Sequence, residues 1–118
     1  MLLALLLFTQ TASECEDPSP DDFRPYTLCL AETDLDRKEI RLDRQLRITL
    51  ARVASRHGIA AERRLRKEQR VWLQARNHKC AAFAVSTPIT QEARNELACR
   101  AQLTAQRTKQ LKRIEQRR

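Results

Sequence analysis

Glycine is almost missing from this chain of 118 residues, in which Gly58 stands alone. A glycine-rich phosphate loop, a dinucleotide-binding fingerprint and a nucleophile elbow each need at least two glycines at fixed spacing, so all three are excluded. Five aromatic residues are too few for the stacking platforms that read single-stranded RNA. The residues present also supply no set of acid, base and nucleophile. We therefore expect a protein that is not an enzyme and needs no cofactor.

Acidic and basic residues are concentrated in different segments of the chain, which carries a formal net charge of +8. Residues 14–36 hold eight acidic residues and one basic residue, whereas residues 37–118 hold 22 basic and seven acidic residues. This division predicts that the acidic segment folds back on the basic body, although a solvated arm would have the same composition. Pro18, Pro20 and Pro25 predict an irregular, acidic lead-in over residues 14–25.

The only long apolar run, Leu2 to Phe8, is followed by the small and polar stretch Thr9 to Ser13. This order predicts a secretory signal peptide over residues 1–13, and the run is too short to span a bilayer. A terminal helix packed on the body is the alternative, because no basic residue precedes the run. Cys15 follows Glu14 rather than a small residue, which argues against lipid attachment. We expect an exported protein, periplasmic or secreted, without a membrane span once processed.

The four cysteines are Cys15, Cys29, Cys80 and Cys99. Behind an export signal they predict two disulfides, and the pairing of sequence neighbours, Cys15 with Cys29 and Cys80 with Cys99, is favoured. Cys29 is also within reach of Cys80, so other pairings stay open. A zinc site would recruit His78 and Cys80, but the chain has no Cys-x-x-Cys pair, and we expect no metal.

Apolar residues recur at helical spacing, and no alternation typical of strands competes with them. A first helix is predicted over residues 26–57, with Gly58 as its stop. A second is predicted over residues 60–83, with an inner face of Leu65, Trp72, Ala75, Cys80 and Phe83. A third begins with Thr87 as N-cap and Pro88 at its first position. The apolar stripe of the first helix consists of Leu28, Ala31, Leu35, Leu42, Leu46, Leu50 and Val53. The stripe of the third helix consists of Ala93, Leu97, Ala101, Thr104, Leu111 and Ile114.

Short connections between long helices predict an all-α fold, a small antiparallel bundle of three helices over residues 26–118 that disulfides staple. In that topology Cys29, Cys80 and Cys99 lie at one end of the bundle. Gln69, Trp72 and Arg76 share one face of the second helix. The tryptophan is expected in the helix interface, and an acid on the first helix, such as Asp43, is expected to pair with Arg76. We interpret this group as scaffold rather than as a reactive site.

Three motifs are more specific than amphipathicity requires: Leu42-Asp43-Arg44-Gln45-Leu46, Gln69-Arg70-Val71-Trp72 followed by Arg76 and Cys80, and Cys99 followed by Leu103, Thr104, Arg107 and Leu111. In order and spacing the chain resembles the N-terminal domain of the lysozyme inhibitor LprI family, small exported bacterial proteins. The family usually has aspartate where this chain has Asn77, which would remove an ion pair.

The resemblance implies a non-enzymatic protein that blocks lysozyme by protein–protein contact. Such inhibition needs a surface that fills a cleft lined by two carboxylates. Candidate groups near one end of the bundle are Arg76, His78, Lys79, Ser86 and Thr87. Common animal lysozymes are basic, so a basic inhibitor is repelled at long range unless the acidic residues 14–36 supply a complementary patch.

Anionic material of the bacterial envelope is the alternative partner, through the basic residues of the third helix. These residues are Arg100, Arg107, Lys109, Lys112, Arg113, Arg117 and Arg118. A further alternative is an interaction module for another envelope protein, with Trp72 purely in the core. Nucleic-acid binding fits the charge but conflicts with export and disulfides.

Overall fold

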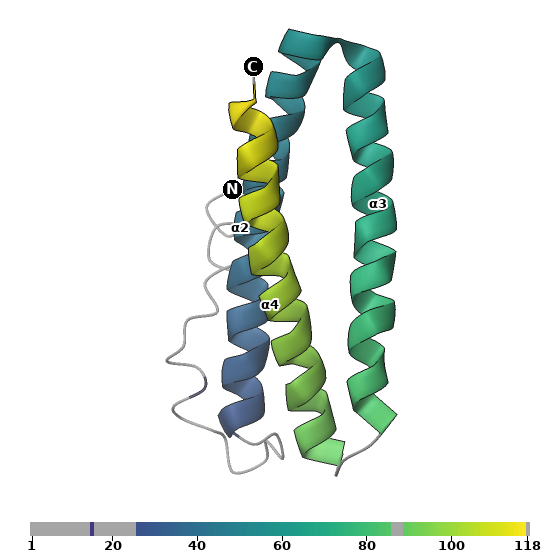
Figure 1. The fold of residues 1–118 in the computed structure, drawn as a ribbon. Helices are drawn as coiled ribbons and strands as arrows, with labels where there is room; N and C mark the ends of the chain where they lie inside the picture. Colours follow the sequence, from purple (N-terminus) through teal and green to yellow (C-terminus); the bar gives the residue numbers. More distant parts are fainter. Residues whose placement is uncertain (1–14, 16–25, 86–88, 118) are drawn as a thin grey trace, which may run out of the picture.

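In the computed structural model the chain forms three long helices, described here for Cys15 and for residues 26–85 and 89–117 (Figure 1). The helices are α2 (Tyr26–His57), α3 (Ile59–Ala81) and α4 (Ile89–Gln116), with a short 3-10 segment, η1 (Ala82–Val85), after α3. No strand occurs within these ranges. The all-α prediction is confirmed, whereas the expected N-cap Thr87 and Pro88 lie outside the described residues.

Gly58 is the whole connection between α2 and α3. Its φ of 90° lies in the left-handed region, which a residue with a Cβ adopts only at a cost. The Gly58 N–H donates to the Ala54 carbonyl at 3.0 Å, and the Gly58 carbonyl accepts from the Glu62 N–H at 3.2 Å. Gly58 thus ends one helix and begins the next, as predicted, and the chain reverses within one residue.

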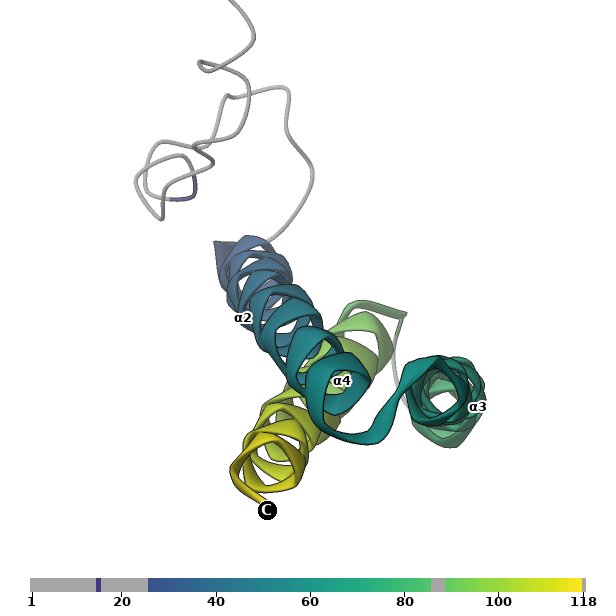
Figure 2. The same cartoon turned by 90° about the horizontal axis from the view of Figure 1, so that it is seen from above.

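The three helices form one antiparallel bundle in which α3 runs opposite to both α2 and α4 (Figure 1). Helices α2 and α4 pack against one another along much of their length, whereas α3 lies to one side and contacts each of them less (Figure 2). One broad side of α3 therefore faces away from the bundle.

An apolar core lies where the upper halves of the helices in Figure 1 meet. It consists of Leu42, Leu50, Val53, Leu65 and Leu111, with Leu46, Ala61, Trp72 and Ile114 packed against it. On α2 the predicted stripe residues Leu35, Leu42, Leu50 and Val53 are buried and Leu46 is half-buried, and on α4 Ala101, Thr104 and Leu111 are buried as predicted.

Helix α3 buries only three residues, Leu65, Arg76 and Cys80. The prediction that Ala75 and Phe83 share its inner face is wrong, since both are exposed. The inward strip runs through Leu65, Arg76 and Cys80 at spacings of eleven and four, and Ala75 lies a step of about 100° to the side of Arg76. Phe83 leaves the strip because the α-helix ends at Ala81 and the 3-10 segment follows.

Two disulfides close the lower end of the bundle as drawn in Figure 1. The predicted pairs are confirmed: Cys15 bonds to Cys29 and Cys80 to Cys99, with Cα atoms 5.6 and 5.5 Å apart. The bridges join cysteines 14 and 19 positions apart in the sequence. In the loop-entropy model each bridge raises the free energy of the unfolded chain by about 3 kcal/mol, because it reduces the conformational entropy of that chain. The second bridge fixes the end of α3 to α4.

Replacing Leu111 with alanine tests the position of the core. Leu111 is fully buried against Leu42, Leu50 and Leu65, so Leu111→Ala should lower the free energy of unfolding by about 3 kcal/mol through lost burial and a residual cavity. The matched control, Lys112→Ala at the next and exposed position, should change it by less than about 0.5 kcal/mol. Urea denaturation measures both, and equal effects would contradict the core described here.

Candidate functional site

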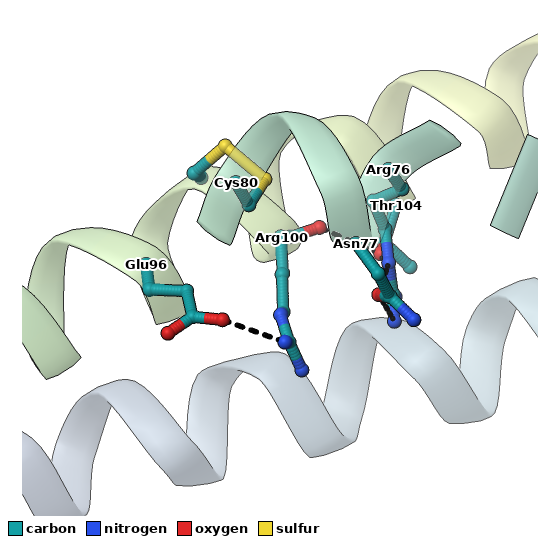
Figure 3. The surroundings of a disulfide bond; sticks show 7 residues. Arg76, Asn77, Cys80, Glu96, Arg100 and Thr104 are labelled. Carbon is teal, nitrogen blue, oxygen red and sulfur yellow. Dashed lines mark hydrogen bonds and ion pairs between the residues drawn. A yellow bond between two sulfur atoms is a disulfide. The ribbon is translucent and has the colours of Figure 1, made fainter. Parts of the chain in front are cut away.

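A charged side chain is buried where the three helices meet. Arg76 of α3 is 6% exposed. Its Nη1 donates to Glu39 Oε1 of α2 at 3.0 Å and to Thr104 Oγ1 of α4 at 2.9 Å. Its Nε and Nη2 donate to Asn77 Oδ1 at 3.1 and 2.9 Å (Figure 3). Because burial of an unpaired charge is costly, these acceptors keep the guanidinium inside and join all three helices.

The prediction that Arg76 pairs with an acid on the first helix is confirmed, but the acid is Glu39 and not Asp43. Glu39 lies one turn earlier on the same face of α2, level with Arg76, whereas Asp43 pairs with Arg47 on its own helix at 2.8 Å. The side chain of Asn77 is uncharged and belongs to the same network. Its amide oxygen accepts two hydrogen bonds from the guanidinium, and the ion pair is retained through Glu39 instead.

Trp72 lies between two guanidinium groups. The Cζ atoms of Arg76 and Arg107 lie 5.6 and 5.9 Å from the centre of its ring, within cation–π distance. Arg107 Nε donates to Gln69 Oε1 at 2.9 Å, which ties α4 to the face of α3 that carries the tryptophan. Burial lowers the pKa of Arg107 from its ordinary value, and the charge of Glu68 opposes that shift.

A second polar cluster joins α2 to α4 beside the core residues Leu42, Leu50 and Leu111. Gln45 Nε2 donates to Thr49 Oγ1 at 3.1 Å and to Glu115 Oε2 at 2.9 Å, and Thr49 donates to the Leu111 carbonyl at 3.1 Å. Apolar spacing along the sequence did not predict this cluster or the roles of Glu39 and Thr104. The available signal was a polar residue inside an apolar stripe, as at Thr49 and Thr104, because such a residue needs a partner when buried.

A groove runs between α2 and α3 above Arg76. One part, of about 400 Å³, is lined by Glu39, Leu42, Asp43, Leu46, Gln69, Leu73, Arg76 and Asn77. The next, of about 360 Å³, is lined by Asp43, Leu46, Arg47, Leu50, Ala51, Glu62 and Arg66. Since Asp43 and Leu46 belong to both, we name the whole the α2–α3 groove. Its floor is leucine, and its rim carries the ion pairs Asp43–Arg47 and Glu62–Arg66, both 2.8 Å long.

The α2–α3 groove collects acidic side chains on a basic body. Glu39, Asp43 and Glu62 are three of the seven acidic residues between positions 37 and 118. Each is paired with an arginine that also lines the groove. The groove is therefore close to neutral in formal charge, unlike the rest of a body that holds 22 basic residues.

The other predicted residues are spread over the molecule. Leu42 and Leu111 are buried, Leu46, Gln69, Trp72, Leu103 and Arg107 are half-buried, and Asp43 and Arg70 are exposed. Among the suggested contact groups Arg76 is internal, His78 and Lys79 are exposed, and Ser86 and Thr87 lie outside the described residues. Lys79 lines a separate hollow of about 520 Å³ with Phe83, Leu103 and residues of α4.

Two of the basic residues expected to bind anionic material on the third helix are already engaged. Arg100 pairs with Glu96 at 2.6 Å, and Arg107 is bonded to Gln69. Lys109, Lys112 and Arg113 are exposed, and Arg118 lies outside the described residues. Lys109, Lys112 and Arg113 lie in the last two turns of α4, near the negative end of the helix dipole.

Nothing in the described ranges forms a metal site or a membrane span. No group of three or more His, Cys, Asp or Glu side chains there could hold a metal ion, and Cys80, the ligand considered for zinc, is bonded to Cys99. None of the described helices is both long enough and apolar enough to cross a bilayer.

Neutralising the two carboxylates of α2 in turn tests the Arg76 network. Glu39→Gln keeps an acceptor but removes the charge opposite a buried guanidinium, so it should lower the free energy of unfolding by about 1–2 kcal/mol. Asp43→Asn, one turn away, removes only an exposed pair within one helix and should cost at most about 0.5 kcal/mol. Chemical denaturation compares the variants, and a larger cost at Asp43 would show that Arg76 depends on that residue instead.

Comparison with protein-family models matches residues 26–111 to the family described as Lysozyme inhibitor LprI. The matched range begins with α2, includes the Cys80–Cys99 bridge and the Arg76 network, and ends at the buried Leu111. No curated protein and no solved structure matches the chain. Since the match spans well over half of the sequence and all three helices, the chain belongs to the lysozyme inhibitor LprI family.

Proposed function

We propose that this protein is an exported, non-enzymatic inhibitor that binds lysozyme through the α2–α3 groove. Family membership supports the partner. Two disulfides agree with an oxidising compartment outside the cytosol. The carboxylates of the groove are held by arginines, and no serine or cysteine nucleophile lies among the residues that line it, which favours binding over catalysis.

The observation that carries the proposal is the gathering of carboxylates in the groove. A basic lysozyme is repelled by most of this body, which is itself basic. Glu39 and Asp43 expose 43% and 59% of their side chains beside the groove. An exposed ion pair within one helix, such as Asp43–Arg47, is worth only a few tenths of a kcal/mol, so a lysine or arginine of the partner can share the Asp43 carboxylate at little cost.

The leucines of the groove supply the apolar part of the contact. Leu42 and Leu50 form a buried floor, Leu46 is half-buried, and Leu73 is 43% exposed at the edge. Protein interfaces concentrate their binding energy in a few apolar or aromatic anchors surrounded by polar groups. The α2–α3 groove, with an apolar floor and a charged rim, has this arrangement. A loop of lysozyme bound in the groove would keep lysozyme from reaching its cell-wall substrate.

Two exposed apolar residues of α3 provide a matched test. Leu73 lines the groove, whereas Val71, 58% exposed, lies on the opposite side of the same helix. Leu73→Arg places a cation in the groove and should weaken inhibition of a common-type lysozyme at least about tenfold. Val71→Arg adds the same charge elsewhere and should change inhibition less than about threefold. The assay is the clearing of a cell-wall suspension, with inhibitor concentration varied at low and physiological salt.

The two parts of the proposal fail separately. If the unmodified protein leaves lysozyme activity unchanged at both salt concentrations, the inhibitory function is wrong. If it inhibits, and Leu73→Arg inhibits as well as Val71→Arg, the function stands and the α2–α3 groove is not the contact. Circular dichroism of both variants checks that each remains folded.

A further inference from the structure

The outer face of α3, the side turned away from α2 and α4 (Figures 1 and 2), carries basic residues from Arg63 to Arg70. Its positive side chains are all exposed: Arg63, Arg64, Lys67 and Arg70. Residues 63, 67 and 70 follow one another at helical spacing, so their charges form one row. From Arg63 to Arg70 the row extends about 10 Å at the rise of an α-helix.

No carboxylate neutralises this row. The two acidic residues of α3 are Glu62 and Glu68. Glu62 lies toward α2, where it pairs with Arg66, and Glu68 lies toward α4, where its charge acts on Arg107. Within the described part of the chain, none of the ion pairs involves Arg63, Lys67 or Arg70. Like charges at these spacings repel one another, so the face carries unbalanced positive charge.

The position of the row on the helix adds to its potential. Arg63 and Arg64 lie within the first two turns of α3, where the exposed N–H groups form the positive end of the helix dipole. On α4, Arg113 lies in the last turn, at the negative end of the dipole, and Lys109 and Lys112 precede it. The dipole therefore adds to the positive potential near Arg63 and Arg64 and reduces it near Arg113.

We propose that the outer face of α3 is a binding site for a linear polyanion, a polymer whose closely spaced phosphate or sulfate groups track the row of basic side chains. This site is separate from the α2–α3 groove and does not depend on lysozyme inhibition. Neutralisation of several phosphates by lysine and arginine releases condensed counterions, which drives binding without recognition of sequence.

The composition of the face favours a polymer over a lipid surface or a nucleic acid. An interfacial helix needs an apolar side to insert, but the apolar residues Leu65 and Trp72 face the core, and only Val71 adjoins the outer row. Nucleic-acid strands gain affinity by stacking bases on aromatic side chains, and α3 has none on this face, since its one aromatic residue, Trp72, lies between Arg76 and Arg107.

The test compares two triple variants of the oxidised full chain with equal loss of charge. Arg63→Gln/Lys67→Gln/Arg70→Gln removes the row on α3, and Lys109→Gln/Lys112→Gln/Arg113→Gln removes the exposed cluster on α4. Binding to fluorescently labelled long-chain inorganic polyphosphate is measured by anisotropy over a series of salt concentrations. The α3 variant should lose at least about tenfold in affinity and about 2–3 in the slope of log K against log salt. The α4 variant should lose less than about threefold.

Melting temperatures of both variants show that the fold is kept, since all six residues are exposed. Equal losses in the two variants would mean that net charge alone drives binding, and would overturn the assignment to α3. Absence of binding by the unmodified protein would overturn it as well. So would tighter binding to phosphatidylglycerol vesicles or to oligothymidine than to polyphosphate of equal charge, since each would place the affinity in lipid or base contacts that this face does not offer.

Discussion

The position of α3 depends on the guanidinium of Arg76. This helix buries one core leucine, one disulfide cysteine and the arginine, in that order along its length. Leu65 holds the end near Gly58 by apolar contact, and Cys80 holds the other end covalently. Between them Arg76 is the one buried residue of the helix, and it contacts Glu39 on α2 and Thr104 on α4. A buried charge of this kind adds little net stability, but it accepts only one arrangement of its partners, and so it fixes the register of three helices.

Loose packing of α3 leads to both of the proposed surfaces. On its inner side, α3 and α2 are separated by the α2–α3 groove, which has leucines at its floor and ion pairs at its rim. Its outer side is covered by nothing in the described structure and carries unpaired bases. Three of the seven acidic residues between positions 37 and 118 thus line the groove where α3 faces α2, whereas the solvent side of α3 carries exposed bases. A protein with a net charge of +8 can in this way offer different faces to a basic protein and to an anionic polymer.

The fold was largely predictable because its determinants are local. A single glycine at position 58 stops one helix and begins the next, and apolar spacing gives the faces of α2 and α4. Neighbouring cysteines along the chain are the ones that bond. The site was less predictable because its contacts join residues 28 to 70 positions apart. Glu39 and Asp43 lie on the same face of α2, and only the level of Arg76 on the opposite helix selects between them. The spacing of residues within one helix does not show how high a residue of α3 lies relative to α2. It also does not show that Ala75 lies beside the strip of α3 that contacts α2 and α4.

The most direct test of this account is the coupling energy between Arg76 and Thr104. Unfolding free energies of Arg76→Met, Thr104→Val and the double variant, measured in urea, form a double-mutant cycle. If the guanidinium and the hydroxyl hold α3 to α4, each single change removes one hydrogen-bond partner of a buried polar group, and the double variant should be more stable than the sum of the single effects by about 1 kcal/mol or more. Additive effects, within about 0.5 kcal/mol, would show that the two side chains act independently and that Arg76 does not join these helices.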